Sequence, residues 1–181
     1  QICLNANQTQ VQSLDLNSQI KEEKNQIKRL QSLIKRLDKQ MLDLIKENTE
    51  LDKTYSKLVG ITGVGPITSI KCIVETYNFV SFKNARKFSC YCGLAPFPYQ
   101  SGSSIKGKTR THHLRNRPLK AILFQAACTA IQHDLQLKRY YSRKVQEGKP
   151  KILVINAVAN KLVLRIFAVI KREEPFVKLA A

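Results

Sequence analysis

The sequence contains no tryptophan, and it has only seven glycines and six prolines in 181 residues. Turn-rich all-β proteins need more of these turn residues, so their scarcity argues against that class. No apolar run reaches the roughly 18 residues that a membrane span requires. Residues 1–14 are polar and do not resemble a signal peptide. We therefore expect a helical, cytoplasmic protein that does not enter a membrane.

Patterns typical of disulfide frameworks and metal sites are also missing. The five cysteines are an odd number without framework spacing. Cys90 and Cys92 are separated by one residue, whereas zinc ligands of this kind are usually separated by two. We therefore expect a reducing compartment, buried thiols, and neither a metal nor another cofactor in this chain.

Acidic residues are scarce after the first third of the chain. Residues 1–52 hold eight basic and eight acidic residues, whereas residues 53–181 hold 23 basic and five acidic ones. From Thr76 to His133 there is no acid, and there are nine Lys or Arg. Such a block suits a polyanion, most often nucleic acid. A basic surface that only confers solubility is the plainer alternative.

A heptad repeat is the first pattern that the chain does contain. Two apolar series recur every seven residues, the second three residues after the first: Ile20, Ile27, Ile34 and Met41, then Leu30, Leu37, Leu44, Leu51 and Leu58. After a tail at 1–13, this pattern predicts a coiled-coil helix over 14–58. So narrow a stripe needs a second chain or a returning helix, unless the helix packs on its own domain. Asn48 falls on an a position, where a polar side chain can fix the register.

The remainder predicts a compact helical domain over 59–175 and a tail at 176–181. Helical patterns follow one another along it: residues 67–77, Phe82–Tyr91 with Ser81 as its cap, Arg117–Gln132, a helix from Asp134, and Lys151–Arg172. No set of alternating strands is apparent. The predicted fold class is therefore all-α, a long N-terminal coiled-coil helix followed by a compact helical domain.

The stretch GVGP, from Gly63 to Pro66, separates two of these apolar helical patterns. Residues 55–76 therefore predict a helix–hairpin–helix near the start of the domain. Gly63 and Gly65 would let the backbone approach a phosphate, whose charge the N–H groups and the helix N-terminus would hold. A plain turn between two helices is the alternative.

Residues 93–116 are the longest stretch without periodicity and predict a basic loop. Loops of this length inside compact domains tend to be functional. Its serines and cations are Ser101, Ser103, Ser104, Lys106, Lys108, Arg110 and Arg115. A serine hydroxyl in a cationic loop could attack a phosphodiester, because the cations neutralise its oxygens. Composition alone favours a phosphate-binding loop without covalent chemistry, since no carboxylate partner is visible.

Five successive motifs together resemble a known family. They are GITGVGPITS, FKNARKFSCYCGLAPFPYQSGSSIKGKTR, LKAILFQAACTAIQHD, YYSRKVQEGKP and VANKLVLRIFAVIKR. Roughly residues 55–175 are similar to the C-terminal half of the Piv/MooV-type insertion-sequence transposases. These are DEDD transposases related to a bacterial DNA invertase. Many members have Arg-x-Gly-Asn where this chain reads HHLRNRPLK, in which Arg115, Asn116 and Lys120 are the nearest matches.

The resemblance implies a DNA-binding domain that acts in DNA transposition by transesterification, with Ser101 as the nucleophile. It implies nucleic-acid contacts at Gly102, Lys106, Gly107, Lys108, Arg110, Arg115 and Lys120, to which the predicted helix–hairpin–helix adds Gly63 and Gly65. It also implies a guide (bridge) RNA, and a RuvC-like domain whose four acidic ligands bind Mg²⁺. Residues 1–52 have no strand to carry such ligands, so we expect this chain to bind DNA and to pair through its coiled coil, but not to recombine DNA alone. The alternative is a non-catalytic module for nucleic-acid binding and dimerisation.

Overall fold

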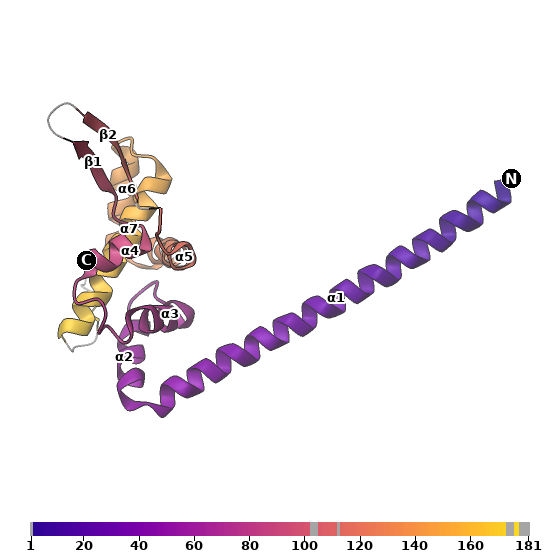
Figure 1. Cartoon of the computed structure of the whole chain (residues 1–181), viewed down its shortest axis with the longest axis horizontal. Coiled ribbons are helices and arrows are strands. Elements are labelled where there is room, and N and C mark those ends of the chain that lie inside the picture. Colours follow the sequence, from indigo (N-terminus) through magenta and orange to yellow (C-terminus); the bar gives the residue numbers. More distant parts are fainter. Residues whose placement is uncertain (1, 102–104, 112, 173–175, 178–181) are drawn as a thin grey trace. The chain divides into compact units, whose positions relative to one another are not determined.

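The computed structural model describes the backbone of residues 2–101, 105–111, 113–172 and 176–177, and the side chains of residues 16–96, 111, 113–172 and 176–177. It divides into two units, residues 1–44 and 45–181. Seven helices and one two-stranded hairpin make up the described chain (Figure 1). The prediction of a mainly helical protein is confirmed.

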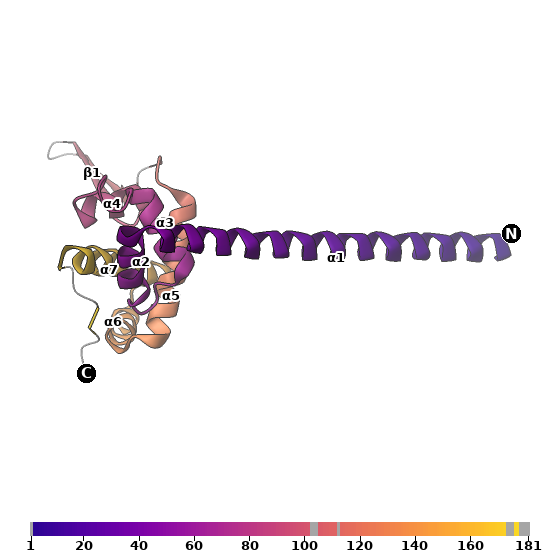
Figure 2. The ribbon, with the colours of Figure 1, turned by 90° about the horizontal axis from the view of Figure 1, so that it is seen from below.

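The first unit is formed by α1 (Ile2–Glu47), a single uninterrupted helix (Figure 2). The predicted tail at 1–13 is wrong, because the helix already begins at Ile2 in a stretch without Gly or Pro. The large apolar side chains along its heptad stripe are 39–63% exposed: Leu16, Ile20, Ile27, Leu30, Leu33, Ile34, Leu37, Met41 and Leu44. Within the described chain, therefore, nothing covers this stripe.

The predicted continuous helix over 14–58 is interrupted at Asn48. There α1 ends at Glu47, and α2 spans Thr49–Val59. The Oδ1 atom of Asn48 accepts hydrogen bonds from the backbone N–H groups of Glu50 at 3.0 Å and Leu51 at 3.2 Å. Those groups have no partner inside a helix that starts here. Asn48 is therefore the N-cap of α2, not an a position within one long coiled-coil helix.

The second unit is built around α7 (Lys151–Arg172), which packs against α2, α4 (Ala85–Cys92), α5 (Arg117–His133) and α6 (Leu135–Gln146) (Figures 1 and 2). The remaining helix, α3 (Pro66–Thr76), packs against α2 and α5. Among the described helices, α7 alone is long and apolar enough to cross a membrane, with a mean hydropathy of 1.9. One face of α7 is buried among its neighbours, so we interpret it as the core helix of this unit: Val154, Val158, Ala159, Leu162, Val163, Ile166 and Val169.

Local side-chain chemistry sets where α4 begins. The predicted start at Phe82 with Ser81 as the cap is wrong, because Asn84 Oδ1 accepts the Arg86 N–H at 2.8 Å. Phe82 instead packs its ring against Phe88 at a centroid distance of 5.3 Å. Gly93 ends α4 at φ +70°. Phe82 thus contributes to the core without belonging to the helix.

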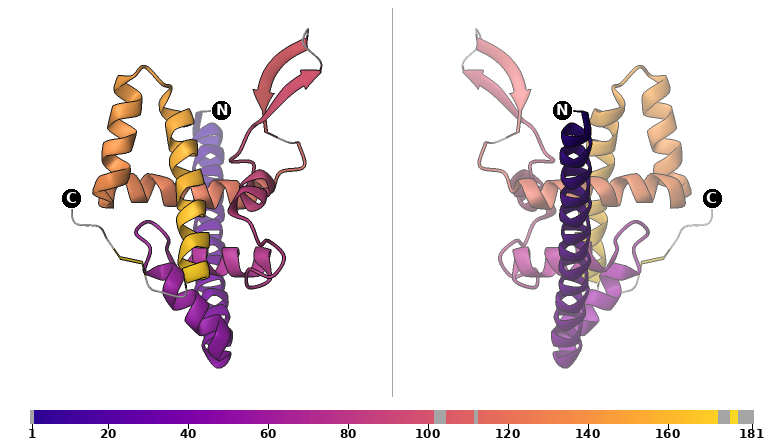
Figure 3. Two further views of the ribbon diagram at one scale, coloured as in Figure 1. Left: turned by 90° about the vertical axis from the view of Figure 1, so that its left-hand side faces the viewer. Right: turned by 90° about the vertical axis from the view of Figure 1, so that its right-hand side faces the viewer.

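The all-α prediction and the predicted loop over 93–116 require a correction, because this segment contains a β-hairpin. Strand β1 (Phe97–Ser101) pairs antiparallel with β2 (Ile105–Arg110). Figure 3 shows both strands extending away from the helices of the second unit. Pro98 lies within β1 and interrupts the usual strand pattern, yet a two-stranded ribbon has only edge strands, where proline is tolerated. Because of Pro98, the sequence shows no recognisable strand pattern in this segment.

Candidate functional site

The candidate site is the hairpin together with the helix ends from which it leaves and to which it returns. In the ladder, Ser101 pairs with Ile105, Gln100 with Lys106, and Tyr99 with Gly107. Phe97 pairs with Arg110. Between Phe97 and Tyr99 the register shifts, and the facing stretch of β2 contains Lys108. A β-bulge produces an irregularity of this kind. The hairpin therefore places the backbone of Ser101 on a strand adjacent to the basic segment. Gly102, Ser103, Ser104 and His112 lie outside the described residues.

The two ends of the hairpin meet at Gly93. This glycine has a φ of +70°, and a Cβ built there would lie 2.4 Å from Cδ of Arg115. The Arg115 side chain therefore crosses directly over the Gly93 backbone. A larger residue at position 93 would displace it, so the glycine is required both by the turn and by this close approach.

Asn116 anchors the chain where it returns from the hairpin. Its backbone N–H donates to the carbonyl of Tyr91 at 2.9 Å, and its Nδ2 donates to the Tyr91 hydroxyl at 3.0 Å. Its Oδ1 accepts the N–H of Leu119 at 3.0 Å and so caps α5. One residue thereby joins the end of α4 to the start of α5.

A hydrogen-bond network extends this anchor to α3. The Tyr91 hydroxyl donates to Glu75 Oε2 at 2.7 Å, and Lys71 Nζ lies 2.9 Å from Glu75 Oε1. The hydrogen bond from Lys71, followed by that from Tyr91, lowers the pKa of the Glu75 carboxyl. The same bond to Glu75 raises the pKa of Tyr91. Glu75 is therefore an ionised structural acceptor that holds the return of the hairpin.

Asn156 on α7 fixes the other end. Its Nδ2 donates to the Leu94 carbonyl at 2.8 Å, three residues before β1. Leu94 is itself fully buried, and its N–H donates to the Ser89 carbonyl at 2.9 Å. The hairpin thus begins and ends on backbone that α3, α4 and α7 hold in place.

Three cations lie around the start of α5. Arg115 and Lys120 are half-buried and Arg117 is exposed. Partial burial, and then the nearby charge of Arg115, lower the pKa of Lys120. The positive end of the helix dipole adds to this field. Arg115 and Lys120 were predicted from the sequence, whereas Arg117 was not, although its position one residue after the Asn116 cap was an available signal.

Gly63 and Gly65 belong to a second location. Gly63 has a φ of +92°, and an added Cβ would lie 2.6 Å from Ala130 Cβ and 2.8 Å from the Ala126 carbonyl oxygen. Gly63 is therefore packed against the C-terminal half of α5. Gly65 caps α3 with nothing within 4 Å of an added Cβ, so its surroundings are open. The stretch from Arg117 to Ala130 spans about 20 Å of helix, so the predicted contacts fall into two separate groups.

The described residues contain no group of three or more His, Cys, Asp or Glu that could hold a metal. Cys72 and Cys92 are buried, and burial is the main cause that raises the pKa of both thiols, that of Cys72 to about 12. Protonated buried thiols are poor nucleophiles and poor metal ligands.

Comparison with known proteins identifies similar sequences. The profile of the Transposase IS116/IS110/IS902 family matches residues 55–142. The pilin gene-inverting protein of Moraxella bovis is 32% identical over 136 residues, covering 75% of this chain and 42% of that protein. The pilin gene-inverting protein of Moraxella lacunata matches with the same identity and the same coverage of both chains. The insertion element IS110 43.6 kDa protein of Streptomyces coelicolor is 31% identical over 116 residues, covering 63% of this chain and 28% of that protein.

The chain thus spans less than half the length of these relatives. The matched segment begins in α2, includes the hairpin and both groups of predicted contacts, and ends in α6. Residues 55–142 therefore resemble the domain that the profile of the Transposase IS116/IS110/IS902 family describes.

Proposed function

We propose that this chain is the DNA-binding, serine-bearing part of a transposase or site-specific recombinase. The observation that carries the proposal is the pairing of β1, which ends at Ser101, with β2, which holds Lys106, Lys108 and Arg110. The family match and the relatives named for pilin gene inversion support the same class of reaction. The family also suggests a cytoplasmic location.

The proposed chemistry is transesterification. The Ser101 hydroxyl oxygen attacks phosphorus, the P–O bond to one DNA strand breaks, and a phosphoserine ester forms. The hydroxyl proton leaves to solvent, and the departing DNA oxygen takes up a proton. Later attack by a DNA hydroxyl reverses the exchange. The cations of β2 would hold the phosphate oxygens while these bonds change.

The described residues do not supply the acidic metal ligands that the family resemblance implies. We therefore assign to this chain binding and the nucleophile, and we route no step through a metal. A RuvC-like domain would have to come from elsewhere. The second candidate function, a non-catalytic module for binding and pairing, is favoured by the exposed stripe of α1.

Salt dependence tests the proposed DNA binding. If the six cations Lys106, Lys108, Arg110, Arg115, Arg117 and Lys120 each neutralise one phosphate, the slope of log K against log salt is about −5. The affinity for duplex DNA should then fall by about 1,000-fold between about 50 and 200 mM salt. Fluorescence anisotropy with a labelled duplex measures both quantities.

A pair of charge variants separates this interface from a generally basic surface. Arg110→Gln should reduce the slope by about one unit, because one phosphate contact is lost. Lys28→Gln removes the same charge from α1 and should leave the slope unchanged. Equal reductions in both variants would favour the generic basic surface over the proposed interface.

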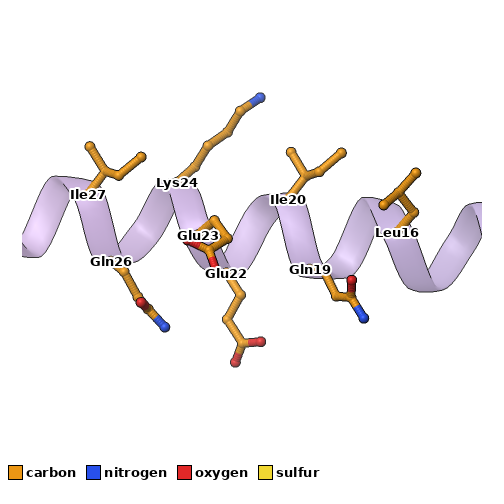
Figure 4. Close-up of a pocket in the computed structure, with 8 residues that line it drawn as sticks. All are labelled: Leu16, Gln19, Ile20, Glu22, Glu23, Lys24, Gln26 and Ile27. Carbon is orange, nitrogen blue, oxygen red and sulfur yellow. The ribbon is translucent and has the colours of Figure 1, made fainter.

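We also propose that α1 pairs with α1 of a second copy. Its a positions carry Ile20, Ile27 and Ile34, and most of its d positions carry leucine, a combination typical of parallel two-stranded coiled coils. Figure 4 shows Leu16, Ile20 and Ile27 projecting from one side of the helix, while Gln19 and Gln26 project from the other. This stripe is exposed within a single chain, and a partner helix would bury it.

Ile34→Lys should weaken self-association by at least about 100-fold, because a charge would replace a buried side chain in both helices. Analytical ultracentrifugation of the whole chain measures the change. Asn25→Lys introduces the same charge at an f position and should leave association unaltered. A wild-type chain that sediments as a monomer at all concentrations would exclude this pairing.

A guide RNA is the remaining part of the proposal that comes from the family resemblance. The basic hairpin and the start of α5 would bind its phosphates as they bind those of DNA. Competition between a labelled DNA duplex and a structured RNA distinguishes shared from separate sites. If RNA does not compete with the DNA duplex at any concentration, RNA does not bind at this interface.

A further inference from the structure

The turn that follows α3 has an uncommon backbone. Tyr77, Asn78 and Phe79 lie at φ angles of +49°, +54° and +64°, three consecutive non-glycine residues in the left-handed region. L residues other than Gly, Asn and Asp rarely adopt this conformation. Where such strain persists, the surrounding structure must hold it, and it is concentrated at functional sites.

Thr76 and Phe79 hold this turn rigidly on the domain. The Oγ1 atom of the buried Thr76 donates to the Cys72 carbonyl at 2.7 Å and accepts the Phe79 N–H at 2.9 Å. The Thr76 carbonyl accepts the Ser81 N–H at 3.0 Å. The Phe79 ring packs edge-on against Phe167 of α7 at a centroid distance of 5.1 Å. The turn is therefore a fixed feature of the fold.

What this turn presents to solvent is an aromatic ring. Tyr77 is 76% exposed, and its apolar neighbours Val74 and Val80 are 60% and 72% exposed. The Tyr77 side chain makes neither a hydrogen bond nor a ring contact with any described residue. The left-handed backbone at Tyr77 ends α3, because its N–H donates to the carbonyls of Ile73 and Val74, and that at Phe79 directs a ring onto α7. The Tyr77 ring itself faces outward, where it suits a flat apolar ligand.

The charge that follows the turn in sequence indicates what that ligand is. Lys83, Arg86 and Lys87 follow within ten residues, are exposed, and form no salt bridge with a described residue. The nearest acid, Glu75, is occupied by Lys71 and Tyr91. An exposed ring followed in sequence by unpaired cations matches a nucleobase flanked by phosphates, because bases stack on aromatic rings while cations track the backbone.

We propose that Tyr77 is a stacking platform for an unpaired base of a bound nucleic-acid strand, with Lys83, Arg86 and Lys87 contacting the adjacent phosphates. This inference rests on the proposed nucleic-acid binding and adds the class of ligand. A base inside a duplex cannot stack on a side chain, so the ligand is a single strand, a gap or a bulge.

Variants at position 77 separate the ring from the backbone. Tyr77→Asn and Tyr77→Gly remove the ring and suit a left-handed residue, so both should fold at least as stably as the wild type in thermal unfolding. Both should lose about 5- to 150-fold in affinity for a single-stranded oligonucleotide. Affinity for a fully paired duplex should stay within about twofold, because phosphate contacts remain. Tyr77→Phe keeps the ring and should bind like the wild type.

A direct contact is tested by photocrosslinking to a single strand that contains 5-iodouracil. Mass spectrometry should find the adduct on the tryptic peptide of residues 72–83. Ile152→Ser, at an apolar position that is also 72% exposed, is the matched control and should change neither affinity nor crosslinking.

Several results would overturn the inference. Unchanged single-strand affinity in Tyr77→Asn would do so, and so would equal losses on single strand and duplex. A change in self-association with unaltered oligonucleotide affinity would instead identify a protein contact. If the wild-type chain binds neither single strand nor duplex, the proposed function fails together with this inference.

Discussion

Ser101→Ala should abolish covalent attachment to DNA while leaving DNA binding unchanged. The alanine removes the attacking oxygen but none of the cations on β2. Loss of a nucleophile of this kind lowers the rate by at least about 1,000-fold. The assay supplies the chain with a RuvC-like nuclease domain, a guide RNA and labelled DNA. It then measures the protein–DNA adduct on a denaturing gel and binding by anisotropy.

The neighbouring hydroxyls are the matched controls for this experiment. Ser103→Ala and Ser104→Ala change the same kind of side chain within three residues and should retain the adduct. Adducts that survive Ser101→Ala but disappear in one of the other two variants would transfer the role to that serine. If all three variants form adducts, covalent chemistry does not depend on this segment.

Gly63→Ala should destabilise the domain by about 2–5 kcal/mol. Two effects add: an alanine at φ +92° is strained, and its Cβ would lie 2.6 Å from Ala130 Cβ. The turn between α2 and α3 would then have to move away from α5. Urea unfolding followed by circular dichroism measures the change as a lower midpoint with a similar slope.

Gly65→Ala is the control within the same turn. Nothing lies within 4 Å of its added Cβ and its φ is −88°, so the loss should be less than about 1 kcal/mol. Adding Ala130→Gly to Gly63→Ala removes one of the two clashing atoms and should recover part of the stability, as a double-mutant cycle can show. A stable Gly63→Ala variant with weakened DNA binding would assign Gly63 to phosphate contact instead of packing.

Much of the helical domain could be predicted because its signals are local. Pro66 marks the first turn of α3, Gly93 the end of α4, and the apolar period of α7 gives both of its ends. Asn48 was harder, because an asparagine at a heptad position and an asparagine N-cap have the same spacing. Only the hydrogen bonds to Glu50 and Leu51 separate these two interpretations.

The site was less predictable because its geometry depends on distant contacts. Nothing local indicates that Arg115 lies over Gly93, or that Gly63 packs on Ala126 and Ala130. The hairpin lacked a strand signal because Pro98 and a lysine-rich pattern conceal it. Composition correctly identified this stretch as basic. It could not predict the pairing of two short strands, because that pairing depends on contacts between separate segments of the chain.

The anchoring of both ends of the hairpin has an evolutionary consequence. Asn116 and Asn156 hold its base to the helices, so the separation of the two ends does not depend on how many residues lie between them. Natural insertions and deletions should therefore accumulate at the far end of this ribbon and spare its base. Relatives could differ in the length of this segment while the helical scaffold beneath stays the same.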